Sequence, residues 1–214
     1  MIKERWLEFC NRVGISSSDE YGNVIYASYG APDRHYHVLE HIDSMLQAFD
    51  SCRHRFVHPD EVEYAIFMHD IIYDTRANDN ERRSAELAAD WIVRSTARLD
   101  TSVVQELVMA TVHKDQPTNE DARLLVDIDT MVFAGEWSAY LRYASAIRLE
   151  YAWVPEAVYR SERARILKRF LGKERVFLTD LFDDAAEERA RENILHEILI
   201  LEGHESDAAI FTNC

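Results

Sequence analysis

Apolar residues recur three and four positions apart along most of this chain, a spacing that places their side chains on one face of an α-helix. In the segment 34–51, for example, Val38, Ile42, Met45 and Phe49 form a single stripe. No segment shows the convincing two-residue alternation of a half-buried strand. The pattern therefore predicts an all-α fold. The predicted helices cover residues 3–13, 34–51, 59 into the stretch 67–74, 81–97, 101–113, 119 through 132, 137–153, 156–171 and 183–201.

The segment 14–31 interrupts this periodicity with serines and glycines, which favour turns. Because it also carries Tyr21, Tyr26 and Tyr29, we expect an ordered loop packed on the body of the protein. No linker, repeat or low-complexity tract divides the chain. We therefore expect one helical domain over residues 1–214, with a motif-bearing core at about 29–135, C-terminal helices at about 136–203 and a loose tail at 204–214.

Composition agrees with a compact helical protein, since 47% of the residues are apolar and only six glycines and four prolines occur. Three widely spaced cysteines do not form a disulfide framework and favour a reducing compartment. No apolar run has the length of a signal peptide or a membrane span, so we expect a cytoplasmic protein without a membrane partner. The net charge of -15 repels a nucleic-acid polymer and attracts metal cations. A homo-oligomer remains open.

The stretch 67–74 places a histidine directly before a carboxylate, at His69 and Asp70. If the apolar stripe of the preceding helix is extended, His69 lies on the buried face and Asp70 at its edge. A buried carboxylate beside a buried imidazole is costly unless a cation such as a divalent metal holds both. The same pair also fits a histidine at a helix C-terminus followed by a loop aspartate, so this stretch alone leaves both interpretations open.

Two further groups of residues are compatible with a metal site. Arg34, His37 and His41 share one face of the predicted helix at 34–51, where the two histidines can reach one metal or form an ordinary surface pair. Asp127 and Asp129 lie about equally far from the centre of the apolar stripe on a later helix. Periodicity therefore does not say which of the two aspartates points inward.

The order His41, His69–Asp70, Asp129 resembles the H…HD…D signature of the HD superfamily of metal-dependent phosphohydrolases. Five segments in the right order resemble one bacterial branch, the predicted metal-dependent HD-superfamily phosphohydrolases, over about residues 29–200. These segments are R-x-Y-H-x-L-x-H-I at 34–42, HD-x-x-Y-D at 69–74, N-E-x-x-S-A at 80–85, D-x-D at 127–129 followed by Gly135, and I-R-x-E-Y-x-x-V-P at 147–155.

This resemblance implies an HD-type helical bundle with a metal between its helices. It implies the ligands His41, His69, Asp70 and Asp129, with the choice of Asp129 over Asp127 taken from the family pattern. Imidazole and carboxylate ligands suit Mn, Fe, Co, Ni or Zn, with Mg a further candidate, as one or two ions.

The implied reaction is hydrolysis of a phosphomonoester or phosphodiester in a small phosphorylated metabolite or nucleotide, by a metal-activated water. Asp70 would orient or deprotonate that water, and Arg34 would bind a phosphate oxygen. His37 corresponds to the proton donor of the similar H-N-x-x-H stretch in cyclic-nucleotide phosphodiesterases. Val38 stands where that family has Asn, which leaves the orientation of His37 open.

Four other residues have weaker assignments. His113 is either a ligand of a second metal or a surface residue, and Asp74, Asn80 and Glu81 are expected to support the pocket. Asn80 alternatively caps the helix that follows it. Two alternative functions also remain at this stage: a di-iron oxygenase of the HD type, and a non-catalytic sensor that binds a metal or nucleotide.

Overall fold

The computed structural model describes residues 2–205 and residue 210 of the chain. Within this part every long regular element is an α-helix, which confirms the predicted all-α class. The elements are α1 (Ile2–Val13), α2 (Ser18–Tyr29), α3 (Leu39–Cys52), η1 (Arg53–Arg55), α4 (Pro59–Met68), α5 (Asn80–Ser95), α6 (Thr101–Ala110), α7 (Glu120–Asp129), η2 (Met131–Ala134), α8 (Trp137–Glu150), α9 (Glu156–Leu171) and α10 (Asp184–Leu201).

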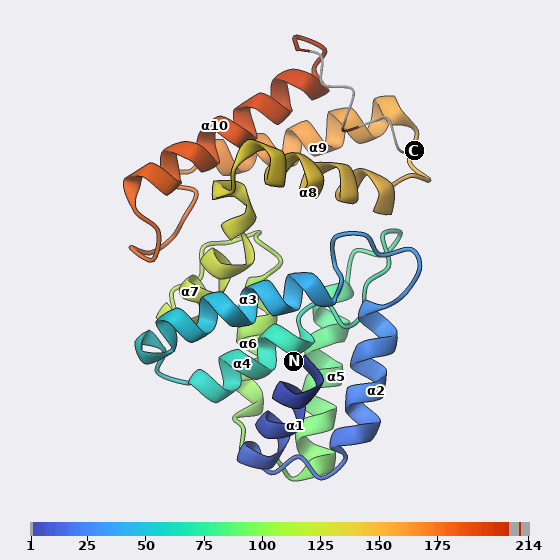
Figure 1. Cartoon of the computed structure of the whole chain (residues 1–214), viewed down its shortest axis with the longest axis vertical. Coiled ribbons are helices and arrows are strands. Elements are labelled where there is room, and N and C mark those ends of the chain that lie inside the picture. The colour runs from blue at the N-terminus through green and yellow to red at the C-terminus, as the bar shows by residue number, and fades with distance from the viewer. Residues whose placement is uncertain (1, 206–209, 211–214) are drawn as a thin grey trace. The chain divides into compact units, whose positions relative to one another are not determined.

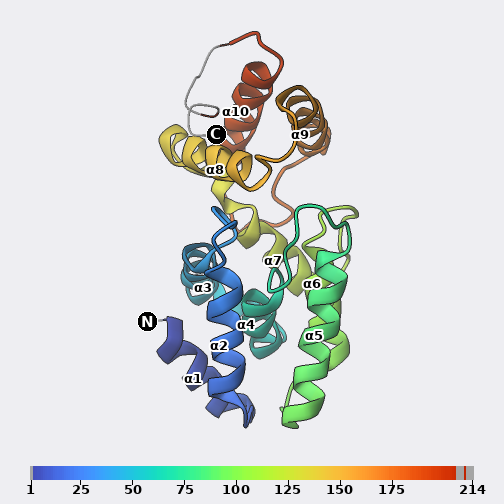
Figure 2. The same cartoon turned by 90° about the vertical axis from the view of Figure 1, so that its right-hand side faces the viewer.

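The chain divides into two compact units, residues 1–128 and residues 129–214. In the first unit α4 packs against α3, α5 and α6, while α1 packs against α2 (Figures 1 and 2). In the second unit α10 packs against α8, α9 and η2. The division falls close to the predicted boundary between the motif-bearing core and the C-terminal helices. The assignment of a single domain stays a prediction.

Helix α4 is the central helix of the first unit, because every residue from Val62 to Met68 is buried. Its Tyr64 and Phe67 join Trp6 and Phe9 of α1 in an aromatic cluster, with the Phe9 and Tyr64 rings stacked at 5.8 Å. Full burial of one such aromatic side chain contributes about 1.5–3 kcal/mol. The helix that leads into His69 is therefore held firmly by packing.

The expectation of a loop at 14–31 was wrong, because α2 occupies most of that segment. Tyr21, Ile25 and Tyr29 recur every four residues and are buried, so the helical period was present beneath the serines and glycines. Gly22 has a packing role, since an added Cβ would lie 3.0 Å from the Trp6 ring. Tertiary packing thus decides the conformation of a segment whose composition favours turns.

Several predicted helix ends also require correction. The helix expected from residue 34 begins at Leu39, because Val38 adopts an extended conformation and residues 34–38 form a loop. The helix expected to reach His113 ends at Ala110, and His113 itself has a positive φ of 55°. The helix expected through residue 132 ends at Asp129 and is followed by the separate turn η2.

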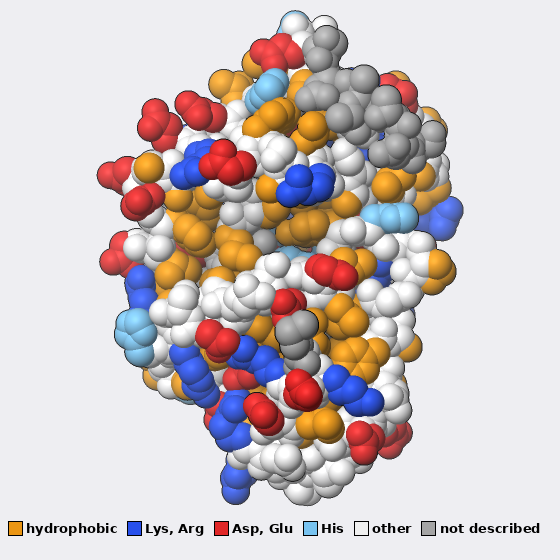
Figure 3. Space-filling model, viewed as in Figure 1, with side chains coloured by type: hydrophobic (Ala, Val, Ile, Leu, Met, Phe, Trp, Pro, Cys, Tyr) orange, Lys and Arg blue, Asp and Glu red, His pale blue; other side chains and the backbone are white. Residues whose placement is uncertain are grey.

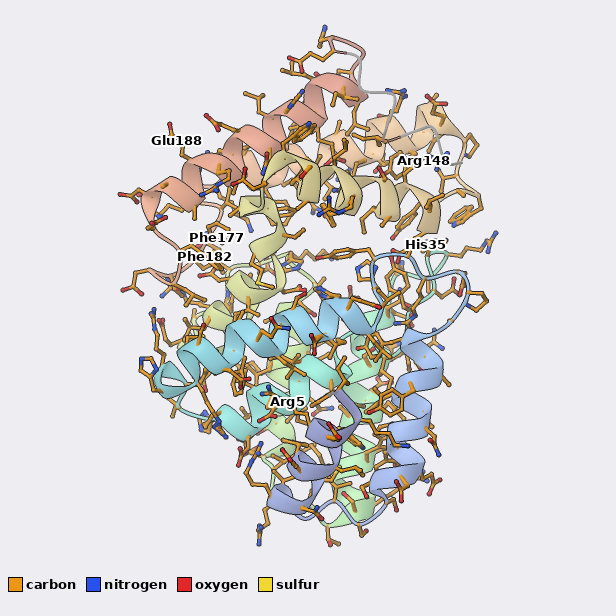
Figure 4. All side chains as sticks on the ribbon, in the orientation of Figure 1. Arg5, His35, Arg148, Phe177, Phe182 and Glu188 are labelled. Atoms are coloured by element: carbon orange, nitrogen blue, oxygen red, sulfur yellow. The ribbon has the colours of Figure 1, made fainter. Side chains whose placement is uncertain are left out.

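In the second unit, side-chain hydrogen bonds fix the irregular segments. Asn193 of α10 donates from Nδ2 to the carbonyl oxygens of Phe133 and Gly135, each at 2.8 Å, and so holds η2. Before α10, the rings of Phe177 and Phe182 pack together with centroids 4.3 Å apart (Figure 4).

The predicted tail lies mostly outside the described residues, which omit 206–209 and 211–214.

Surface properties agree with the charge balance of the sequence. On the face drawn in Figure 3, basic side chains lie among more numerous acidic ones and form no continuous basic stripe. No helix in the described part of the chain has the length and apolar character needed to cross a membrane. Cys10 and Cys52 are buried and carry free thiols.

Candidate metal centre

The carboxyl end of α4 presents His69. Its backbone N–H closes the last turn on the carbonyl of Ala65 at 2.9 Å, and its ring Nδ1 lies 3.0 Å from the carbonyl oxygen of Ile66. A carbonyl can only accept, so this contact assigns the proton to Nδ1 and leaves the lone pair on Nε2. That is the tautomer in which a histidine binds a metal through Nε2.

Asp70 follows with its Oδ2 atom 3.0 Å from Nε2 of His69. Two ligands about 2.1 Å from one ion and at right angles are about 3.0 Å apart, so this separation is one that a shared cation would produce. The side chain of Asp70 is 12% exposed, whereas that of His69 is 1% exposed. The pair is therefore a buried imidazole with a carboxylate at the edge of the site.

His41 comes from the first turn of α3. It is buried beside a stripe formed by Ile42, Met45, Leu46 and Phe49, which fixes that helix on its neighbours. The His41 and His69 rings lie 5.5 Å apart between centroids. The two histidines, which are 28 positions apart in sequence, therefore lie close together.

Asp129 is the last residue of α7, and the rest of this helix belongs to the first unit. Asn119 precedes the helix, and its Oδ1 accepts from the N–H of Asp121 at 2.9 Å. The buried carboxylate of Asp121 in turn accepts from the N–H groups of Val57 and His58, each at 2.8 Å. The start of α7 is thus tied to residues 57 and 58, which directly precede α4.

Ligand-type atoms of His41, His69 and Asp129 all lie within 4.8 Å of one another. Two atoms on opposite sides of an ion with bonds of about 2.1 Å are about 4.2 Å apart, so the group has roughly the dimensions of a coordination sphere. Two imidazole nitrogens and one carboxylate oxygen also suit a divalent transition metal. The structure places Asp129 in this group, whereas the predicted ligand Asp70 is not part of it. Asp127, which is fully buried, is not part of it either.

His37 lies beside the group, in the loop before α3. Its Nε2 atom is 3.8 Å from Oδ2 of Asp70, and its ring packs against Tyr73 at a tilt of 34°, with centroids 4.2 Å apart. The shared helical face predicted for Arg34, His37 and His41 does not exist, because only His41 is helical. The loop nevertheless brings His37 to within 6.2 Å of His41 between ring centroids.

Arg34 does not project into open solvent, since the residue is 7% exposed. Its guanidinium donates to the backbone carbonyls of Asp70 and Ile71 at 2.7 and 3.0 Å. These carbonyls follow the end of α4, where unsatisfied acceptors are expected and a cation is favourable. Phosphate binding by Arg34 stays a prediction.

The remaining predicted residues serve the loop after His69–Asp70 or lie apart from it. Asn80 does not cap α5 but begins it, and its amide pairs with the backbone of Asp74, accepting at 3.1 Å and donating at 3.0 Å. Glu81 is half-buried in the first turn of α5. Among the described residues the ligand group does not include His113. Roles in metal binding for Asp74, Glu81 and His113 stay predictions.

Two residues near the site were missed from the sequence. The hydroxyl of Ser84 accepts from the N–H of Ile72 at 3.1 Å, and its place in N-E-x-x-S-A was the available signal. The hydroxyl of Tyr29 contacts the backbone at Phe67 and Asp70, but the segment around it had been interpreted as a loop. Both residues fix the backbone on either side of His69.

Comparison with known proteins adds no assignment: no family model, curated protein or solved structure matches the chain.

Proposed function

We propose that this protein is a metal-dependent phosphohydrolase that acts on a small phosphorylated metabolite or nucleotide. One observation carries the proposal: His41, His69 and Asp129, from three separate helices, bring ligand-type atoms within 4.8 Å of one another. The resemblance of the sequence to the HD superfamily names the same three residues as ligands. The spatial grouping thus supports a hypothesis that was reached without it.

His41, His69 and Asp129 would hold the ion, with Asp70 at its edge as a fourth ligand. A divalent metal supplies two kinds of chemistry in such a site, since it lowers the pKa of a coordinated water to about 7 and polarises a phosphoryl oxygen. The expected metals are Mn, Fe, Co, Ni or Zn, or Mg, as one or two ions.

The protein's own groups would then position the reactants. Asp70, whose Oδ2 is 3.0 Å from His69 Nε2 at the exposed side of the pair, orients the attacking water and accepts its proton. His37, 3.8 Å from Asp70, donates a proton to the departing alkoxide. An imidazole suits this task because its ordinary pKa of about 6.5 allows both protonation states near neutrality. The ring of Tyr73 packs against that of His37, with centroids 4.2 Å apart.

A small substrate agrees with the electrostatics better than a polymer does. The formal charge of -15 repels a long polyanion, whereas a metal inverts the potential within one pocket and attracts a single phosphate group.

The test is a screen of phosphomonoesters and phosphodiesters against apo-protein reloaded with Mn, Co, Ni, Zn or Mg. We expect metal-dependent hydrolysis, seen as free phosphate from a phosphomonoester or as a phosphomonoester and an alcohol from a phosphodiester, and we expect it to be lost in Asp70→Asn. A metal-loaded protein that hydrolyses no substrate of either kind would overturn the proposal. Two irons per chain with oxygen-dependent turnover would then favour the oxygenase, and metal or nucleotide binding without turnover would favour the sensor.

A further inference from the structure

The guanidinium of Arg34 connects the two loops that carry His37 and Asp70. Its Nη1 donates to the carbonyl of Asp70 at 2.7 Å and to that of His37 at 3.3 Å, and its Nη2 donates to the carbonyl of Ile71 at 3.0 Å. One side chain therefore links the backbones of the expected proton donor and the expected water-orienting carboxylate. Such a link depends on the planar fork of arginine, which lysine lacks.

Two tyrosines hold this guanidinium in place. Its central carbon lies 5.0 Å from the ring centroid of Tyr29 and 5.3 Å from that of Tyr73. Both distances are within the range of cation–π attraction. Tyr73 also packs against the His37 ring, so the same aromatic side chain contacts both Arg34 and His37.

Tyr29 reaches the same backbone from the side of α2. Its hydroxyl donates to the carbonyl of Phe67 at 3.0 Å and accepts from the N–H of Asp70 at 3.3 Å. The stretch 67–71 is thus bound at three carbonyls and one amide by two side chains that lie before α3 in sequence.

We propose that Arg34 and Tyr29 are positioning residues that form a clamp on residues 67–71, and that Arg34 acts on the metal site through Asp70 and not by binding substrate phosphate. The proposal rests on the proposed function in one respect, the assignment of Asp70 and His37 to the reaction. In this proposal the clamp fixes the distances from the carboxylate of Asp70 to the imidazoles of His37 and His69. Three of the five guanidinium N–H donors point at backbone carbonyls, which leaves two for a ligand and favours the clamp over the phosphate role.

The second unit offers a matched control. Arg148 of α8 is 5% exposed, donates to the carbonyls of Tyr151 and Val154 at 2.7 and 3.3 Å, and stacks over Tyr159 at 4.7 Å (Figure 4). It repeats the chemistry of Arg34 in the second unit, at a residue that is not one of the proposed ligands. Arg148→Lys therefore measures what happens when a buried guanidinium that binds backbone carbonyls is lost at a residue without a proposed role in the site.

The experiment compares Arg34→Lys, Tyr29→Phe and Arg148→Lys in the full-length protein. Affinity for Co²⁺ and Zn²⁺ is measured by titration of apo-protein, and amide hydrogen exchange over residues 67–72 is measured without metal. We expect Arg34→Lys to bind either metal about 10- to 100-fold more weakly, the usual effect of removing a group that orients a ligand. Tyr29→Phe should lose less metal affinity, because it keeps the aromatic ring and removes only the hydroxyl. The amide of Asp70 should exchange faster in this variant. Arg148→Lys should leave both readouts as in the wild type.

Unchanged metal affinity and exchange in both clamp variants would overturn the proposal, and an increase of KM alone in Arg34→Lys would restore the phosphate role. If Arg34→Lys does not fold, Tyr29→Phe decides by the same measurements. Should the wild type bind no metal, the proposed function fails. Amide hydrogen exchange would still test the clamp, because the clamp predicts faster exchange over residues 67–72 in the variants whether or not a metal binds.

Discussion

Two buried polar clusters, one around His69 and one around Glu197, accommodate buried charge in different ways. In the second unit, Glu197 is fully buried and pairs with Arg163, whose Nε lies 2.8 Å from Oε1. The hydroxyl of Tyr140 donates to Oε2 at 2.6 Å, and Nη2 of Arg163 donates to the hydroxyl of Tyr143 at 3.0 Å. This cluster contains its own cation.

The cluster around His69 instead brings together atoms of the kind that bind cations. His41, His69 and Asp129 contribute nitrogen and oxygen ligands, and Asp70 stands 3.0 Å from His69. We propose that its counter-charge comes from solution as a metal ion. The comparison teaches that buried polarity by itself does not indicate a functional site. What distinguishes the Glu197 cluster is that Arg163, a cation of the chain itself, pairs directly with its carboxylate.

The pKa shifts in the second cluster fit a structural role. Burial would lower the pKa of Arg163, but the charge of Glu197 holds it well above its ordinary value. Burial and, after it, the charge of Glu197 raise the pKa of Tyr140 well above its usual range. These groups therefore keep one protonation state throughout the physiological range, which suits a fixed framework and not proton transfer.

The largest expected difference between the clusters is their response to metal. With free metal at 100 times the dissociation constant, the wild type should gain about 2.7 kcal/mol of unfolding free energy. His69→Ala and Asp129→Ala should gain essentially none, because each removes a ligand. The measurement is thermal unfolding with and without added metal, together with metal content after desalting.

The control for this prediction is a double variant in the other cluster, Arg163→Met/Glu197→Leu, which should retain the metal response of the wild type. Equal metal content in the wild type and both ligand variants would refute the assigned site.

A second expected difference concerns proton transfer. His37→Gln should retain metal, because His37 is not in the ligand group, but should slow turnover by about 10²- to 10⁴-fold, the usual contribution of a general acid. The measurement is kcat with a substrate found in the screen, alongside metal content. If His37→Gln instead strips the metal, His37 is a ligand and the division of roles is wrong.

The third prediction concerns the cluster that contains its own cation. Glu197→Leu alone should destabilise the fold by about 3–5 kcal/mol, because it leaves the charge of Arg163 buried and uncompensated. Adding Arg163→Met should recover part of that loss. Full recovery is not expected, since the hydroxyls of Tyr140 and Tyr143 lose polar partners at about 1–3 kcal/mol each. Chemical denaturation of the single and double variants measures these terms, and additive losses would show that the pair is not coupled.

Much of the fold was predictable because most helices have strong apolar periodicity and clear ends. The predicted segments 3–13, 156–171 and 183–201 agree with α1, α9 and α10 to within a residue or two at each end. The prediction for segment 14–31 was wrong because its serines and glycines were given more weight than the helical spacing of Tyr21, Ile25 and Tyr29. Local composition carries no information about the Trp6 ring against which Gly22 packs.

The site was predictable in part for a related reason. The grouping of His41, His69 and Asp129 followed from motif order, although spacing alone did not separate Asp127 from Asp129. The wrong start for the helix at 34–51 gave Arg34 and His37 a helical register that they do not have. Contacts such as those of Arg34 with the backbone at residues 70 and 71 join segments far apart in sequence. No pattern within either segment could have predicted them.

The smallest expected effect belongs to a third buried carboxylate, Glu187, which resembles Glu197 in having its partners within the chain. Its carboxylate accepts from the N–H groups of Val176 and Phe177 at 2.8 and 3.1 Å and from Arg191 at 2.8 Å. Burial would raise its pKa, but these hydrogen bonds outweigh burial and lower the pKa.

A lowered pKa in the folded state means that this group stabilises the protein above its ordinary pKa of about 4.3, and that the stabilisation is lost as pH falls through the folded value. Glu187→Gln should therefore cost about 1–3 kcal/mol at pH 7 and progressively less below about pH 4. Urea unfolding of wild type and variant across this range measures the difference. A cost that stays constant down to pH 3 would mean that the charge of Glu187 does not contribute to stability. The comparison with Glu197 would then not extend to this loop.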